Sequence, residues 1–286
     1  MERMAPCKVN LALDILGRRA DGYHELRMVM QTVSLCDTVR MTEAADGFRF
    51  STSGDFVPAG RKTLEQRAAE AFFAWIGQPM PGLCVALEKR TPAYAGLGGG
   101  SADVAALLHM LRDTYAPRLS GEALERIGFS VGSDMPFCVR GGTALAEGRG
   151  ERLTDLPALP ACWFVLCKPD FGIPTPALFA LADEQAHRGC PDIAGMTAAL
   201  EEENLEGVAK RLCNVFEEVL PPEYREVFTI RDRLRELGAL NAAMSGSGPT
   251  VFGVFKTEDA ASMAAAALRE TYSQTFVAQP VQRMTP

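Results

Sequence analysis

The sequence of 286 residues is poor in metal-binding residues and in long apolar runs. It contains three histidines, and its eight cysteines form no Cys-x-x-Cys pair. Zinc sites draw mainly on closely spaced cysteine and histidine, so we do not expect one. No apolar run approaches the ~20 residues that a membrane-spanning helix requires. The opening MERMAPCKVN also lacks the apolar core of a signal peptide, so we expect a cytoplasmic protein with no membrane partner.

Positive charge is also scarce. The formal net charge is −7 and the isoelectric point is near 5.2. Nonspecific binding of nucleic acid rests on a basic surface, so nucleic acid is not an expected partner. Hydrophobic residues make up 47% of the chain, which is enough for a proper core in one large domain or two. Lysine is rare beside arginine, and the lysines are Lys8, Lys62, Lys89, Lys168, Lys210 and Lys256.

Strand and helix patterns interleave along the chain, which predicts an α+β fold. Alternating apolar residues predict strands at 7–16 and 25–43, with a turn-rich loop at 17–24 between them. The Pro-rich segment 154–162 predicts a boundary between domains of residues 1–156 and 157–286. The other expected elements are helices at 64–75, 101–113, 122–127, 176–187, 196–213, 223–237 and 258–271, and strands at 83–88, 162–167, 240–244, 250–256 and 274–279.

The segment TPAYAGLGGGSADVAALLHML, residues 91–111, places four glycines directly before a helical apolar pattern. Glycine is costly in ordered backbone, so the cluster indicates either a flexible turn or a cradle of bare amides that binds an anion. Ser101 as the helix N-cap and Asp103 in the first turn favour the cradle. A P-loop requires a lysine directly after its last glycine, but the first lysine after this segment is Lys168, so a P-loop is excluded. The dinucleotide-binding pattern Gly-x-Gly-x-x-Gly is disfavoured because Ser101 replaces its last glycine.

Two segments near the N-terminus contain further candidate residues. Strand alternation puts Lys8 and Asn10 on one face of the expected strand 7–16, although a lone lysine in a strand usually faces water. Tyr23 and His24 follow an Asp-Gly turn, which is typical of a hairpin. An aromatic ring beside an imidazole also suits a nucleobase, because the ring stacks and the imidazole forms a directed hydrogen bond.

Two later segments add three more candidates. Asp134 lies in the loop VGSDMPF, where an aspartate would by default cap a turn. Thr175 and Phe179 are four residues apart at an expected helix start, so they share one face of that helix. Their ordinary roles would be N-cap and core residue.

The motifs in this order resemble those of the GHMP kinases, a family that includes galactokinase, homoserine kinase and mevalonate kinase. Residues 6–11, 92–103 and 245–252 resemble its first, second and third motifs. The string GRRADGYHEL at 17–26 resembles the members whose substrate carries a cytidine diphosphate. The resemblance implies a two-domain fold, in which the N-terminal domain has the topology of a ribosomal-protein domain and the C-terminal domain is ferredoxin-like.

The resemblance also implies an activity and a set of roles. The activity is ATP-dependent phosphorylation of the 2-hydroxyl of a cytidine diphosphate-linked methylerythritol, in the non-mevalonate route to isoprenoids, with ATP and Mg²⁺ as cofactors. Asp134 would accept the hydroxyl proton, Lys8 would neutralise charge beside it, and Tyr23 and Phe179 would enclose the cytosine. The substrate-binding residues are Asn10, Tyr23, His24, Thr175 and Phe179. The ATP-binding residues are Pro92, Ala93, Tyr94, Ala95, Gly96, Leu97, Gly98, Gly99, Gly100, Ser101 and Ala102, and Ser101 is also the expected contact to Mg²⁺.

The chain departs from the family pattern at a few positions. Cys7 and Met135 replace the usual alanine and valine, which are small changes. Ala102 stands where a second serine is usual. The segment KTLEQRAA lacks the Asn-Leu pair that leads the first helix, so we assign no adenine contact to Lys62 or Thr63.

Two alternatives remain open. One is a GHMP kinase with another acceptor alcohol, such as homoserine or a mevalonate derivative, for which residues 17–26 would have no use. The other is a noncatalytic RNA-binding module, which the acidic isoelectric point disfavours. We expect a monomer or a weak homodimer.

Overall fold

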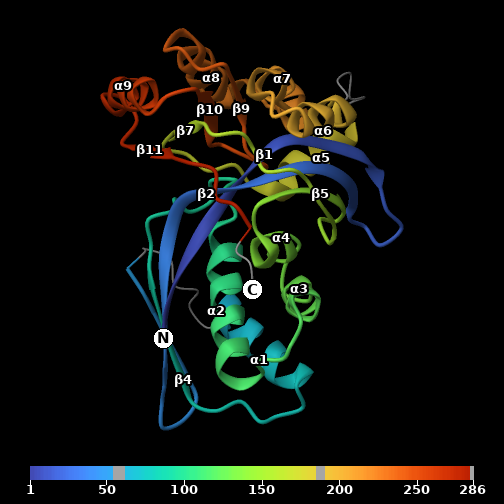
Figure 1. Ribbon diagram of the computed structural model, residues 1–286. Helices are drawn as coiled ribbons and strands as arrows, with labels where there is room; N and C mark the ends of the chain where they lie inside the picture. Colours follow the sequence, from blue (N-terminus) through green and yellow to red (C-terminus); the bar gives the residue numbers. More distant parts are fainter. Residues whose placement is uncertain (54–61, 185–190, 284–286) are drawn as a thin grey trace.

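A computed structural model describes residues 1–53, 62–184 and 191–283. In these ranges the strands form two sheets, of seven and four strands (Figure 1). Two long strands, β1 and β2, run as an antiparallel pair from the lower part of the molecule to the upper part. The bounds of the first sheet are β1 Glu2–Arg18, β2 His24–Glu43, β3 Phe48–Thr52, β4 Leu83–Glu88, β5 Thr143–Gly148, β6 Arg152–Asp155 and β8 Cys213–Asn214.

Four helices pack beside this first sheet and form an apolar core with it. Their apolar faces contribute buried side chains such as Phe72, Phe73 and Leu107, which pack against Val85 of β4. Burying side chains of this size is the main favourable term in folding. The helices are α1 Leu64–Trp75, α2 Gly99–Tyr115, α3 Gly121–Phe129 and α4 Met135–Arg140.

The central strand β1 is buried on both faces from Cys7 to Ile15. The expected alternation between a core face and a solvent face is therefore absent, because Lys8 and Asn10 are covered as well as Val9 and Leu11. The default expectation that a lone strand lysine faces water is wrong here. Lys8 is 4% exposed, since the glycine-rich segment and the third motif cover its face of the strand.

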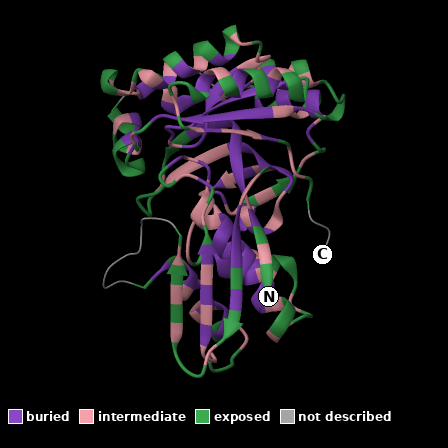
Figure 2. Ribbon diagram, turned by 90° about the vertical axis from the view of Figure 1, so that its left-hand side faces the viewer, coloured by how far each residue is buried: buried purple, intermediate pink, exposed green. Residues whose placement is uncertain are grey.

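The second sheet has the order β11-β7-β10-β9 and lies under a layer of helices. Figure 2 shows its strands as buried, whereas the helices above them expose their outer faces. The strands are β7 Trp163–Lys168, β9 Asn241–Met244, β10 Val251–Phe255 and β11 Gln274–Ala278. The helices are α5 Thr175–Glu184, α6 Ile193–Glu201, α7 Leu205–Lys210, α8 Glu226–Glu236 and α9 Glu258–Arg269, with 3₁₀ turns η1 Val215–Val219 and η2 Pro222–Tyr224.

The two halves of the chain are in close contact. One hydrophobic cluster joins Leu13 and Met30 of the first sheet to Val165 and Phe255 of the second. The end of the chain returns to the first half, where the N–H of Val281 donates to the carbonyl of Thr32 at 2.8 Å. The domain boundary near residue 156 stays a prediction.

Most predicted elements match those observed, and the differences lie at their ends and in short pieces. The helices expected near 196–213 are α6 and α7, which begin three residues earlier and end three residues earlier than expected, with Asn204 capping the second. Helix α4 and strands β3, β5, β6 and β8 were not predicted, although strands of similar length such as β4 were. Residues 185–187 of the expected helix 176–187 lie outside the described residues. Over the described ranges, no helix has both the length and the apolar character to cross a membrane.

Candidate active site

The two predicted catalytic residues, 126 positions apart in the sequence, lie side by side. The Lys8 Nζ atom is 3.4 Å from Asp134 Oδ2, and it donates to Asn10 Oδ1 at 2.7 Å. Lys8 is nearly covered, whereas the side chain of Asp134 is 35% exposed. An ammonium group fixed under an accessible carboxylate can stabilise negative charge that develops next to that carboxylate.

Asp134 owes its position to the turn that precedes α4. It lies immediately before Met135, the first residue of that helix, without capping the helix through its side chain. The default role of a turn-capping aspartate is therefore not observed, and its carboxylate is left to face Lys8.

The glycine-rich segment packs directly on Lys8 and on the third motif. A Cβ atom on Gly96 would lie 2.1 Å from the carbonyl oxygen of Ser245, and one on Gly98 would lie 3.0 Å from Lys8 Cε. Both glycines have positive φ, 73° and 67°, which other residues rarely adopt. The backbone N–H of Lys8 also donates to the carbonyl of Leu97 at 2.9 Å. Contacts within the protein therefore require glycine at positions 96 and 98, whether or not a ligand binds there.

The third motif holds this segment in place from the other half of the chain. Ser245 Oγ donates to the carbonyl of Gly96 at 3.0 Å and accepts from the N–H of Asn10 at 3.3 Å. Asn214 in turn donates to the carbonyls of Met244 and Gly246, each at 2.8 Å. The first, second and third motifs therefore meet at one point. Ser245 and Asn214 were not among the predicted site residues.

Helix α2 begins at Gly99, so the prediction that Ser101 caps it is wrong. Gly98 occupies the N-cap position in a left-handed conformation, and the N–H of Ala102 donates to its carbonyl at 2.9 Å. A glycine N-cap has no side chain to bind the first amides. The N-terminus of α2 therefore offers N–H groups and the positive end of the helix dipole to an anion.

An ionic cluster fixes the start of α2 against the end of β4. Lys89 forms ion pairs with Asp37 and, at 2.5 Å, with Asp103 of α2. Asp37 also accepts the backbone N–H groups of Arg90 and Thr91, at 2.5 and 2.7 Å. Burial by itself would lower the pKa of Lys89, but the two carboxylates raise it, so the ammonium form is favoured. Asp103 thus binds a lysine rather than the first helical amides.

The described residues offer few protein ligands for a metal ion. No group of three or more His, Cys, Asp or Glu among them could hold one. Mg²⁺ typically takes one or two protein oxygens together with phosphate oxygens and water. The hydroxyl of Ser101, on the first turn of α2, fits that limited role.

Of the predicted substrate residues, His24 and Phe179 contact each other, whereas Tyr23 contacts Arg149. The rings of His24 and Phe179 are stacked with centroids 4.5 Å apart, and His24 Nε2 lies 2.7 Å from Asp183 Oδ1. Tyr23 is 50% exposed, and the Arg149 guanidinium lies 3.5 Å from its ring centre. Enclosure of cytosine by Tyr23 and Phe179 stays a prediction.

Thr175, the first residue of α5, connects the substrate residues to the third motif. Its hydroxyl lies 2.6 Å from that of Ser247. Phe179, one turn further on, packs edge-on against Phe216. The two residues share a helix face, as their spacing predicts.

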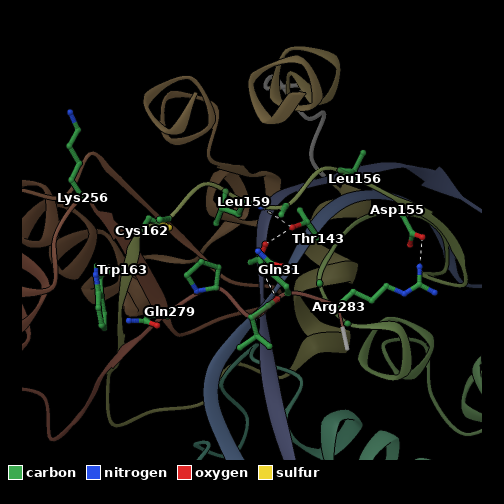
Figure 3. A pocket seen from close by; sticks show the side chains of 17 residues that line it. Gln31, Thr143, Asp155, Leu156, Leu159, Cys162, Trp163, Lys256, Gln279 and Arg283 are labelled. Atoms are coloured by element: carbon green, nitrogen blue, oxygen red, sulfur yellow. Dashed lines mark hydrogen bonds and ion pairs between the residues drawn. The ribbon is translucent and has the colours of Figure 1, made fainter. Parts of the chain in front are cut away.

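A separate cavity of about 510 Å³ opens between the segment that follows β6 and the C-terminal segment (Figure 3). None of the predicted site residues lines it. Two pairs of its polar side chains bond to each other: Thr143 with Gln31, and Arg283 with Asp155. Because these polar groups are already paired, we assign the chemistry to the Lys8–Asp134 site.

Comparison with known proteins identifies the class of this site. Residues 63–142 match the model of the GHMP kinases N terminal domain, and residues 196–274 match the model described as GHMP kinases C terminal. The chain belongs to the GHMP kinase family, as its motifs predicted, and the α+β fold with this family's two domains is confirmed.

Individual relatives are similar over nearly the whole chain. A 4-diphosphocytidyl-2-C-methyl-D-erythritol kinase of Moorella thermoacetica is 42% identical over 94% of this chain and 95% of its own. The enzyme of the same name from Clostridium botulinum is 36% identical, over 97% of this chain and 99% of its own. A solved structure of a 4-(cytidine 5'-diphospho)-2C-methyl-D-erythritol kinase superposes with a TM-score of 0.81 at 34% identity, covering 98% of this chain and 99% of that one.

Proposed function

We infer that the protein transfers the γ-phosphoryl group of ATP to the 2-hydroxyl of 4-diphosphocytidyl-2-C-methyl-D-erythritol. The observation that carries this inference is the contact of Lys8 with Asp134 beside the glycine-rich segment and the N-terminus of α2. Relatives named for this substrate, which match the chain almost from end to end, support it.

The chemistry requires positioning and charge neutralisation more than covalent catalysis. Asp134 accepts the proton of the substrate hydroxyl while the hydroxyl oxygen bonds to the γ-phosphorus. The bond from that phosphorus to the β–γ bridging oxygen breaks, and ADP leaves. Lys8 stabilises the charge that gathers on the transferred group. The amides at the start of α2 hold the phosphates of ATP, and residues 92–102 form the wall of this pocket.

Mg²⁺ bound to ATP would neutralise part of the triphosphate charge, and Ser101 would be its protein contact. Asn10, Thr175, His24, Phe179 and Tyr23 would hold the cytidine diphosphate substrate. Asn10 already holds the Lys8 ammonium, so it links recognition of the substrate to the catalytic pair.

A panel of acceptor alcohols tests the function. Purified protein is incubated with ATP, Mg²⁺ and one acceptor at a time: the cytidylylated methylerythritol, homoserine and mevalonate. We expect ADP release with the first alone. Faster turnover of homoserine or mevalonate would replace the proposed acceptor, and no turnover of any alcohol would contradict the reaction class. A salt-dependent filter-binding assay with RNA tests the noncatalytic alternative.

A further inference from the structure

Arg149 is an unpaired cation that two aromatic rings hold in place. It lies between β5 and β6, and its Cζ atom is 3.5 Å from the ring centre of Tyr23 and 4.9 Å from that of Phe129. Among the described residues, no acceptor bonds to its guanidinium, and its Nε atom is buried without a hydrogen-bond partner. Such a group retains its capacity to bind an anion.

Nearby arginines differ because carboxylates already bind them. Arg19 and Arg152 both bind Glu25, at 2.6 and 2.7 Å. Arg140 binds Glu125 at 2.7 Å. Arg149 forms no such ion pair with the described residues. Asp21 lies near enough for its charge to interact with that of Arg149, but no hydrogen bond joins the two side chains.

The turn that carries Arg149 lies between Tyr23, where the base is predicted to bind, and the catalytic pair Lys8 and Asp134. A Cβ atom on Gly150 would lie 3.0 Å from the carbonyl oxygen of Ser133, the residue before Asp134. It would also lie 3.7 Å from Cε of Met28, whose sulfur accepts from Asn10 Nδ2 at 3.3 Å. The side chain of Arg149 thus contacts Tyr23, and the backbone at Gly150 packs beside the residue that precedes Asp134.

The proposed substrate has a matching order of groups. Its cytosine belongs beside Tyr23, its acceptor alcohol beside Asp134, and its two phosphates between them. A guanidinium binds phosphate through parallel N–H donors, and stacking on aromatic rings fixes its plane in advance.

We propose that Arg149 binds the diphosphate of the substrate and leaves the opposite face of Tyr23 for the cytosine. This proposal rests on the proposed function. It explains why an arginine without a carboxylate partner is kept against the ring predicted to stack on the base. It also assigns the recognition of the diphosphate to a residue that the sequence motifs did not indicate.

Binding of cytidine and CDP separates this role from simple support of Tyr23. Calorimetric titrations are made with the ATP site filled by a nonhydrolysable analogue. In the parent protein we expect CDP to bind more tightly than cytidine. In Arg149→Met, we expect CDP to bind about 10- to 100-fold more weakly, the usual effect of losing a hydrogen bond to a charged group. Cytidine binding should change by less than about threefold, well below that effect.

Two further variants complete the test. Arg152→Met removes the same charge from the same hairpin, but its guanidinium already binds Glu25, so CDP binding should stay near that of the parent. Arg149→Lys keeps the charge without the planar donors, and should weaken CDP by a smaller factor than Arg149→Met while sparing cytidine. Arg149→Lys also provides the test if Arg149→Met does not fold.

The outcomes are distinct. Equal weakening of cytidine and CDP would show that Arg149 only supports Tyr23, and unchanged CDP binding in both variants would remove it from the site. Either result overturns the proposal while leaving the kinase function standing. If the parent protein binds neither ligand, the proposed function itself fails.

Discussion

The two ends of the candidate site are built differently. At the phosphate end, segments from distant parts of the chain pack closely: Lys8 contacts Gly98, and Gly96 contacts Ser245. Lys8 and Ser245 are both buried. At the base end, Tyr23 is half exposed, and its hairpin is held by surface ion pairs such as Arg19 with Glu25. Catalytic groups must be held in advance, because the reaction depends on small displacements, whereas a stacking ring tolerates more freedom. Substitutions should therefore affect stability and turnover at the first end, and substrate affinity at the second.

Asp134→Asn should have the largest effect. Loss of a general base lowers the rate by ~10²–10⁴, so kcat should fall by that factor, with ATP affinity nearly unchanged. Steady-state kinetics and ATP titration measure both. Asp21→Asn, at the base end, is the matched control and should leave kcat almost intact. A kcat for Asp134→Asn within about threefold of the parent would remove Asp134 from its role.

Gly96→Ala should cost more stability than the same change at Gly77. Both glycines have positive φ, 73° and 66°, but a Cβ atom meets Ser245 only at Gly96 and meets nothing within 4 Å at Gly77. Gly77→Ala should lose about 1–2 kcal/mol from the backbone alone. Gly96→Ala should lose a further ~1–3 kcal/mol by overpacking. Urea unfolding measures the two, and equal losses would contradict the close packing of the phosphate end.

His109 should make the helix behind the phosphate end sensitive to acid. Burial lowers the pKa of His109 to about 4, against 6.5 ordinarily, and the carbonyl of Val139 lies 3.0 Å from its Nε2. Below pH 6.5 His109 therefore binds a proton in the unfolded chain but stays neutral in the folded protein. The free energy of unfolding falls as the pH is lowered from 6.5 to about 4. At the acid end of this window the loss should reach about 3 kcal/mol.

Replacing the imidazole tests this dependence. His109→Gln has no titrating ring, so its free energy of unfolding should decline less between pH 7 and 4.5 than that of the parent. Urea unfolding at several pH values gives the two slopes. Parallel slopes would mean that His109 is not the group responsible.

Tyr23→Ala should have the smallest effect on the protein itself. Loss of one base-stacking ring should raise KM for the cytidine substrate by roughly tenfold and KM for ATP far less. Because Tyr23 is half exposed, the free energy of unfolding should change little. Tyr23→Phe keeps the ring and should behave like the parent. Equal increases in both KM values would argue against stacking.

The sequence determined the longer elements and the identity of the motif residues. The predicted helix at 64–75 and strand at 83–88 have the observed bounds. Such elements follow from local periodicity and from caps such as Thr63, which lie within a few residues of the pattern they complete. The motifs also identified Lys8 and Asp134, which the structure places in contact.

Tertiary structure alone decided how these pieces meet. Three contacts join segments that no local pattern connects. They are Gly96 with Ser245, Asp103 with Lys89, and Arg149 with the ring of Tyr23. Helix α2 likewise begins at Gly99 rather than at the predicted position. Its N-cap is Gly98, which is left-handed and packs on Lys8, and not Ser101. Propensity and periodicity describe how a residue suits its neighbours along the chain, whereas these contacts depend on which surfaces the folded core brings together.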